Sequence, residues 1–210
     1  MVQLLSTNIQ TREDGALRAM FAARKRVFID LLKWDLPVLE GQFEIDQFDN
    51  EHAHYLILLD SGGEHLASAR LLPTLRPHIL DSLFAQLCDG GIPTGPQIFE
   101  ITRFCLDRGL GAAHRRLARN RLVTGLVEHA LASGIERYTG VAEMGWLEQI
   151  MRFGWDCRPL GLPLRHASGV IGALDIRINE DTPARLDAAG IWSPVTILGA
   201  GERRAAGAKG

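Results

Sequence analysis

The sequence predicts an α/β domain with a mixed sheet that helices cover on both sides. Segments with apolar residues at helical spacing alternate with short segments rich in β-branched and aromatic residues. Ser61-Gly62-Gly63 separates two apolar runs, which is typical of a β-hairpin. A glycine-rich turn, residues 108–111, leads from a predicted strand into a long helix, as in strand-to-helix connections of α/β folds.

The elements follow in a clear order. Helices are expected at about 16–33, 78–88, 112–133 and 144–153, the third ended by Gly134. Strands are expected at 52–60, 64–73, 97–106, 136–142, 155–160 and 169–179. Residues 35–50 are expected to form a loop, because Pro37 and Gly41 interrupt them. We expect a single domain from residue 1 to 198 and a flexible, glycine- and alanine-rich tail from 199 to 210.

Composition excludes several classes of protein. The formal net charge of −2 gives no global basic field for nucleic acid. No apolar run approaches the roughly 18 residues of a membrane span, and the N-terminus lacks the pattern of a secretory signal. The three cysteines are far apart and have no metal-ligand spacing, so reduced thiols and a cytoplasmic location are expected.

Four charged residues stand where the pattern predicts apolar ones. Arg24 lies on the apolar face of the first helix, Arg70 lies in an apolar strand, and Glu100 and Arg103 lie in another. A buried charge is costly unless it is paired, so these residues suggest one shared polar pocket. The alternative is a buried ion-pair network with no chemistry.

Two further carboxylates, Asp46 and Asp49, lie in the loop that follows the first helix. They could bind a metal, cap a helix or pair with arginines, and no other ligand has the spacing of a metal loop. Glu100 and Arg103 have opposite parity along a regular strand, so serving one pocket would require a bulge between or beside them. Such a bulge would also splay the neighbouring strands.

These positions resemble the LuxI-type autoinducer synthase family. The strings FEIDQFD, ARLLPTLRP and EITRF are similar to its three signature segments. The resemblance spans at least residues 24–103 and rests on this set: Arg24, Phe28, Trp34, Asp46, Asp49, Arg70, Phe84, Glu100 and Arg103. It implies a three-layer α/β/α sandwich with a splayed central sheet, similar to GCN5-related N-acetyltransferases.

The resemblance also implies an acyl-homoserine lactone synthase for quorum sensing. Such an enzyme transfers an acyl group from a thioester to the amine of S-adenosylmethionine, closes a lactone and releases methylthioadenosine. The expected catalytic residues are Glu100 as general base, with Arg24, Arg70 and Arg103. The expected S-adenosylmethionine contacts are Phe28, Trp34, Asp46, Asp49 and Arg103. No metal and no cofactor is required.

The acyl donor and the acyl pocket are less narrowly defined by the sequence. Acyl carrier protein is favoured over acyl-coenzyme A because Arg108, Arg115, Arg116 and Arg119, with Arg121, could receive an acidic carrier. Coenzyme A stays open, because Gly111 belongs to an R-x-x-G-x-A pattern that could cradle a pyrophosphate. The expected acyl pocket consists of Phe99, Ile101, Phe104, Leu122, Leu126, Thr139, Val141, Met144, Trp146, Ile150 and Phe153. Its large side chains favour a short or medium acyl chain.

Two other functions fit part of the pattern. An acetyl-coenzyme A-dependent N-acetyltransferase would share the fold and the glycine-rich turn, but it would not explain Trp34, the Asp46/Asp49 pair and Arg24 together. A non-catalytic binding domain would keep the fold and lose the chemistry, whereas every expected charged position is occupied here.

Overall fold

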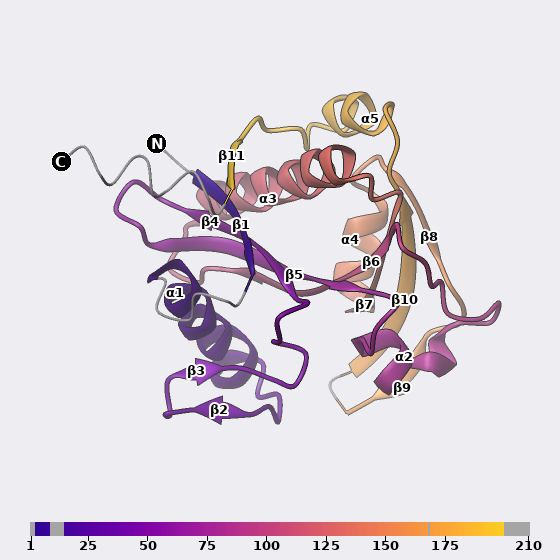
Figure 1. Ribbon diagram of the computed structural model, residues 1–210, viewed down its shortest axis with the longest axis horizontal. Coiled ribbons are helices and arrows are strands. Elements are labelled where there is room, and N and C mark those ends of the chain that lie inside the picture. The colour runs from indigo at the N-terminus through magenta and orange to yellow at the C-terminus, as the bar shows by residue number, and fades with distance from the viewer. Residues whose placement is uncertain (1–2, 9–14, 168, 200–210) are drawn as a thin grey trace. The chain divides into compact units, whose positions relative to one another are not determined.

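The computed structural model describes residues 3–8, 15–167 and 169–199 (Figure 1). The tail expected from residue 199 therefore lies almost wholly outside the described residues. The chain divides into two compact units, residues 1–70, 103–125 and 193–210 in one, and 71–102 and 126–192 in the other. Strands β5 (His65–Pro73) and β6 (Ile98–Leu106) and helix α3 (Ala112–Ser133) run through both units. Within the described part of the chain, no helix is long and apolar enough to cross a membrane.

The first unit is built on strands β1 (Gln3–Asn8), β4 (His54–Leu59) and β11 (Thr196–Gly199). β1 pairs antiparallel with β4 and parallel with β11, and β5 follows β4 in the order of the sheet. Helix α1 (Gly15–Arg24) packs against β4 and against β3 (Phe43–Glu44), which forms a small hairpin with β2 (Val38–Leu39). Leu17 and Met20 of α1 are buried because apolar residues recur on one helical face.

Helix α1 continues directly into a π-helix, η2 (Lys25–Leu31). The N–H of Leu32 donates to the carbonyl of Val27, five residues earlier, at 3.0 Å. The wider turn shifts the side chains that follow Phe28 off the apolar face, so Leu31 and Leu32 are exposed, although their spacing would continue that face in a regular α-helix. π-helical turns occur frequently at functional sites.

Strand β6 is irregular at the position where the sequence predicts a bulge. Glu100 and Thr102 are buried, but the next buried residue is Cys105, so the alternation shifts by one position after Thr102. Arg103 has φ of +50°, a left-handed conformation that non-glycine residues rarely adopt. The expected bulge beside Glu100 and Arg103 is therefore confirmed.

The second unit contains α2 (Ile79–Leu83), the 3₁₀ turn η3 (Ala85–Leu87), β7 (Arg137–Glu143), α4 (Met144–Met151) and α5 (Thr182–Ala188). Its remaining strands are β8 (Asp156–Pro159), β9 (Leu164–His166) and β10 (Gly169–Arg177). β10 pairs antiparallel with β7, β8 and β9, whereas β6 and β7 are parallel, so the sheet is mixed. The parallel register ends at Glu100–Thr139 although both strands continue, which agrees with the expected splay.

Most expected elements are present. The hairpin strands and α3 match their predicted ranges closely, and α2, α4, β6, β7, β8 and β10 are found where the sequence predicts them. Among the described residues, the sequence did not predict the strands β1, β9 and β11, the β2–β3 hairpin inside the expected loop, or helix α5. The single-domain boundary stays a prediction.

Candidate active site

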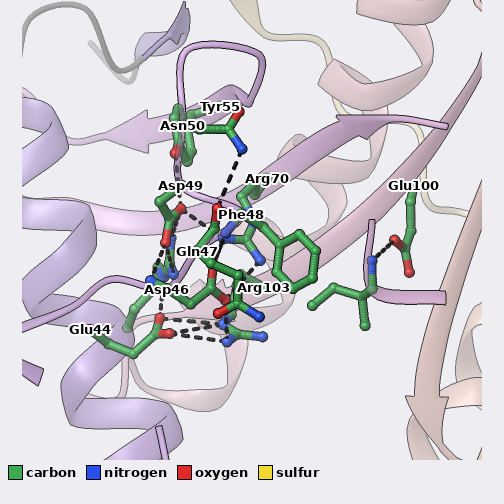
Figure 2. A network of polar contacts seen from close by, with 12 residues as sticks. Glu44, Asp46, Gln47, Phe48, Asp49, Asn50, Tyr55, Arg70, Glu100 and Arg103 are labelled. Carbon is green, nitrogen blue, oxygen red and sulfur yellow. Dashed lines mark hydrogen bonds and ion pairs between the residues drawn. The ribbon is translucent and has the colours of Figure 1, made fainter. Parts of the chain in front are cut away.

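A network of three arginines and three carboxylates lies within the first unit (Figure 2). Arg24 is the last residue of α1, Arg70 is on β5 and Arg103 is on β6. The carboxylates all come from one segment, Glu44 on β3 and Asp46 and Asp49 directly after it. The structure thus brings together five residues that the sequence singled out and adds Glu44.

Arg24 is buried and forms hydrogen bonds with two of the carboxylates. Its Nη1 and Nη2 donate to the two Oδ atoms of Asp49, both at 2.8 Å, and its Nε donates to Glu44. This two-pronged geometry is the strongest arrangement for an arginine and a carboxylate. With 1% of its surface exposed, Arg24 is enclosed in the protein and is not available for direct contact with a ligand.

Arg70 and Arg103 complete the network. Arg70 donates to both oxygens of Asp46, at 2.6 and 3.1 Å, and its Nη1 lies 2.8 Å from Asp49 Oδ1. Arg103 donates to Glu44 Oε1 at 3.1 Å and to Asp46 Oδ2 at 2.7 Å. Each carboxylate therefore bridges two arginines, and the formal charges of the six side chains cancel.

The network favours the ionised forms of Arg24 and Asp49. Burial works against a high pKa for Arg24, but the charges of Asp49 and Glu44 outweigh it and raise the pKa above its ordinary value. Burial likewise favours a higher pKa for Asp49, but Arg24 and Arg70 hold that pKa well below its usual range. Burial and Asp49 raise the pKa of Tyr55, whose neutral hydroxyl donates to Asp49 at 2.9 Å.

One edge of the network is aromatic and less enclosed. The Arg103 guanidinium lies 5.5 Å from the centroid of the Phe28 ring, and Phe28 stacks on Trp34 at 5.0 Å. Trp34 is half-buried, and the side chain of Arg103 is the most exposed of the three arginines at 9%. This edge places a cation beside two aromatic rings, a combination suited to a ligand with both a carboxylate and a cation.

Glu100 lies in the second unit and is fully buried. Its Oε2 accepts a hydrogen bond from the backbone N–H of Ile79, the first residue of α2, at 2.7 Å (Figure 2). The carboxylate therefore holds the start of a helix as well as being a candidate base. Part of the reason why a charge occurs in this apolar strand is structural.

The expected acyl-pocket residues are divided between the units. Phe104 and Leu122 belong to the first unit; the others belong to the second. There, Trp146, Phe153 and Trp155 form a run of edge-on and tilted ring contacts at 5.8 and 5.7 Å, and Val141 packs on a cluster with Ile171 and Ala173. Met144 and Ile150 lie on α4 and are half-buried, as are Phe99 and Ile101 on β6. Leu126 and Thr139 are fully buried.

The expected docking residues surround the start of α3. Arg108, Gly111, Arg115 and Arg116 are exposed, with Leu117 beside them, whereas Arg119 and Arg121 are half-buried. Arg119 donates to Asn120 Oδ1 at 2.7 Å, so part of its hydrogen-bonding capacity is used within the helix. Arg115 and Arg116 are therefore the better candidates for contact with a partner.

Comparisons with known proteins decide the family. The autoinducer synthase family model matches residues 8–186. The chain belongs to this family. An acyl-homoserine-lactone synthase of Rhizobium etli is 34% identical over 76% of this chain and 76% of its own length, and one of Ralstonia solanacearum is 31% identical over 82% and 87%. The activity of the chain is accordingly that of an acyl-homoserine-lactone synthase, an acyltransferase.

Solved structures agree with this family and confirm the fold. The CoA-dependent acyl-homoserine lactone synthase MesI is 29% identical, with a TM-score of 0.82 over 93% of this chain and 98% of MesI. An acyl-CoA N-acyltransferase from Pseudomonas aeruginosa has a TM-score of 0.57 at 15% identity, so the autoinducer synthase shares its α/β fold. The fold similar to N-acetyltransferases is confirmed.

Sequence reasoning missed two members of this synthase's network, Glu44 and Tyr55. Both are fully buried and both contact an arginine or aspartate of the set. A signal for Glu44 was present, because Glu44 and Asp46 alternate with Phe43 and Ile45, which places two carboxylates on one face of an extended segment. No comparable signal marks Tyr55, since an aromatic residue in an apolar strand is ordinary.

Proposed function

We propose that the chain transfers an acyl group from a thioester to the α-amine of S-adenosylmethionine, and then closes the lactone with release of methylthioadenosine. The observation that carries this proposal is the aromatic edge of the ion network, where Arg103, Phe28 and Trp34 meet. S-adenosylmethionine has a carboxylate for a guanidinium and a sulfonium cation for aromatic faces. TofI, 26% identical with a TM-score of 0.74, was solved with an inhibitor and MTA.

The network supplies rigidity to this edge. Arg24 fixes Glu44 and Asp49, and these carboxylates with Asp46 in turn fix Arg70 and Arg103. The strained backbone of Arg103 is held by the same contacts. A guanidinium fixed before the ligand arrives loses little side-chain entropy when it binds a carboxylate. In this proposal Arg103 contacts the substrate, whereas Arg24 and Arg70 position the groups around it.

The first chemical step requires a base. The substrate ammonium gives one proton to Glu100, and the freed nitrogen lone pair attacks the thioester carbonyl carbon. The carbon–sulfur bond of the thioester breaks, and the leaving sulfur takes the second proton from the nitrogen and departs as a thiol.

The second step is intramolecular. A carboxylate oxygen of the acylated substrate attacks its own γ-carbon, the bond from that carbon to the sulfonium sulfur breaks, and methylthioadenosine leaves as a neutral thioether. No proton transfer is needed, so the contribution of the protein is to hold the chain in a folded conformation. Arg103 must hold the carboxylate loosely enough for it to rotate toward the γ-carbon.

For the acyl donor we favour acyl carrier protein. Exposed Arg108, Arg115 and Arg116 lie at and just before the start of α3, and such a group of exposed cations suits an acidic carrier. The competing pyrophosphate cradle at the glycine-rich turn is weakened by Asp107, whose carboxylate already accepts the N–H of Gly109 at 2.7 Å. Acyl-coenzyme A is the second candidate, because MesI is CoA-dependent. The bulky Trp146, Phe153 and Trp155 favour a short or medium acyl chain.

The test uses the purified protein with S-adenosylmethionine and matched acyl groups on carrier protein or on coenzyme A. Mass spectrometry should detect an N-acyl-homoserine lactone and methylthioadenosine in equal amounts, with a higher kcat/KM for the carrier-bound donor. Formation of an acylated amine without methylthioadenosine would favour a plain N-acyltransferase instead. Faster turnover of the coenzyme A thioester would show that the donor proposal is wrong.

A further inference from the structure

Two buried polar atoms flank Glu100 within the second unit. His78 is 1% exposed and Thr139 is fully buried. His78 Nε2 and Thr139 Oγ1 have no hydrogen-bond partner among the residues that the structure describes. Buried polar groups are usually satisfied, so two such atoms beside one carboxylate indicate a place for a polar ligand or water.

Both groups are tied to Glu100 by the backbone. His78 directly precedes Ile79, whose N–H donates to Glu100 Oε2 at 2.7 Å. Thr139 is the register partner of Glu100 on the neighbouring parallel strand, and residues in register point to the same face of a sheet. The imidazole, the hydroxyl and the carboxylate therefore belong to one region of the second unit.

The hydrogen bond at the other ring nitrogen sets the tautomer of the neutral His78 ring. Nδ1 lies 2.8 Å from the carbonyl oxygen of Arg76 and 3.5 Å from Asp81 Oδ2. Both of these oxygens accept, so Nδ1 carries the hydrogen. In the neutral ring, Nε2 then presents a lone pair and can only accept a hydrogen bond.

We infer that His78 is a positioning residue for the acyl transfer. Its Nε2 accepts one hydrogen bond from the group that gives its proton to Glu100, whether that group is the substrate amine or a relaying water. That hydrogen bond restricts the rotation of the amine or water that it holds, and thereby positions it for the proton transfer to Glu100. This inference rests on the proposed function, and it involves no proton transfer to the imidazole.

Two substitutions of similar shape test the roles of Nδ1 and Nε2 separately. In His78→Asn the amide nitrogen replaces Nδ1 and keeps the bond to the Arg76 carbonyl, but no polar atom remains at Nε2. In His78→Gln the side-chain amide reaches the position of Nε2, and the bond to Arg76 is lost. The control is His52→Asn, which removes an exposed histidine.

The experiment measures kcat and KM for lactone formation, together with the melting temperature of each variant. We expect His78→Asn to melt near the parent and to lose about tenfold in kcat, the cost of one buried hydrogen bond in the transition state. We expect His78→Gln to melt lower and yet to stay within about threefold of the parent kcat. Activity and stability would then rank the two variants in opposite orders.

A merely structural histidine gives a different result. If activity follows stability, with His78→Asn at least as active as His78→Gln, the inference is overturned. The parent enzyme alone tests the proposed function, because a parent that forms no lactone contradicts that function whatever the variants do. The ratio of the two variants tests the role of His78.

Discussion

Glu44 joins two of the three arginines of the network, since its carboxylate accepts from both Arg24 and Arg103. Glu44 and Arg24 are both buried, so Arg24 cannot turn to water if the charge of Glu44 is lost. Breaking a buried ion pair leaves an uncompensated charge, which is more costly than losing the attraction of the pair itself. At the scale of single residues, the network therefore links stability to the geometry of the site.

The substitution Glu44→Gln tests this link. It preserves the size of the side chain and removes its charge, so the free energy of unfolding should fall by about 3–5 kcal/mol. Urea unfolding of the purified variant measures the change. The control is Glu51→Gln, an exposed position where the effect should stay within about 0.5 kcal/mol. Equal stability of the two variants would show that the network does not hold the fold.

Glu100→Gln addresses the candidate base. The amide oxygen can still accept the N–H of Ile79, so the start of α2 should be preserved and the protein should stay folded. Loss of the base should lower kcat by about 10²–10⁴-fold. Stopped assays with matched circular dichroism spectra compare activity and folding in the same samples. Turnover within threefold of the parent would mean that another group removes the proton.

At the scale of elements, regular segments could be predicted and irregular ones could not. The bounds of α3 agree with the sequence because its helical pattern is long and Gly134, with φ of +70°, ends it. The π-helix could not be predicted, since it depends on hydrogen bonds between residues five apart and leaves the apolar spacing nearly unchanged up to Phe28. The edge strand β11 is short, and its pairing with β1 is fixed by distant contacts.

The residues of the candidate site also differ in how far the sequence predicts them. Arg24, Arg70 and Arg103 could be predicted because each places a charge in an apolar pattern, and the structure brings all three together. Tyr55 could not be selected, because its role depends on which segments meet in space, whereas the alternation of Glu44 and Asp46 with apolar residues was a signal for Glu44. The bulge at Arg103 follows from parity alone once Glu100 and Arg103 are both taken as inward-facing.

At the scale of elements, the testable prediction is that acyl carrier protein docks at helix α3. Reversing two exposed charges, Arg115→Glu with Arg116→Glu, should raise KM for acyl carrier protein about tenfold, mainly through slower association. The rate of the parent with the carrier should fall as salt rises. The matched control is Arg177→Glu with Arg185→Glu, two exposed arginines of the second unit. Equal effects of the two double variants would argue against docking at α3.

For the whole molecule, the balanced network makes stability depend on pH in the acidic range. The pKa of Asp49 in the folded protein lies below its ordinary value of 3.8, because Arg24 and Arg70 outweigh the effect of burial. The unfolded chain therefore binds a proton on this residue at a higher pH than the folded one does. The stabilising contribution of Asp49 to the free energy of unfolding is fully present above about pH 4. It is lost as the pH falls through the pKa that Asp49 has in the folded protein.

Denaturant unfolding of the parent and of Asp49→Asn between pH 3 and pH 7 tests this direction of the pH dependence of stability. The free energy of unfolding of the parent should fall as the pH drops below about 4. The variant should be less stable at pH 7 and should show a shallower fall. Asp30→Asn, at a half-exposed pair with Lys25, should keep the slope of the parent. If the free energy of unfolding of Asp49→Asn changed with pH as steeply as that of the parent, Asp49 would not be the cause of the acid sensitivity.

The most direct test of the central claim is the product made by the intact chain in cells. The parent and Glu100→Gln would be expressed to equal soluble levels in a host that lacks its own synthase. Extracts of the spent medium would then be analysed by mass spectrometry for the homoserine lactone fragment. The account predicts an N-acyl-homoserine lactone from the parent and at most a trace from Glu100→Gln. Soluble, folded parent protein that yields no lactone, or equal yields from both chains, would contradict it.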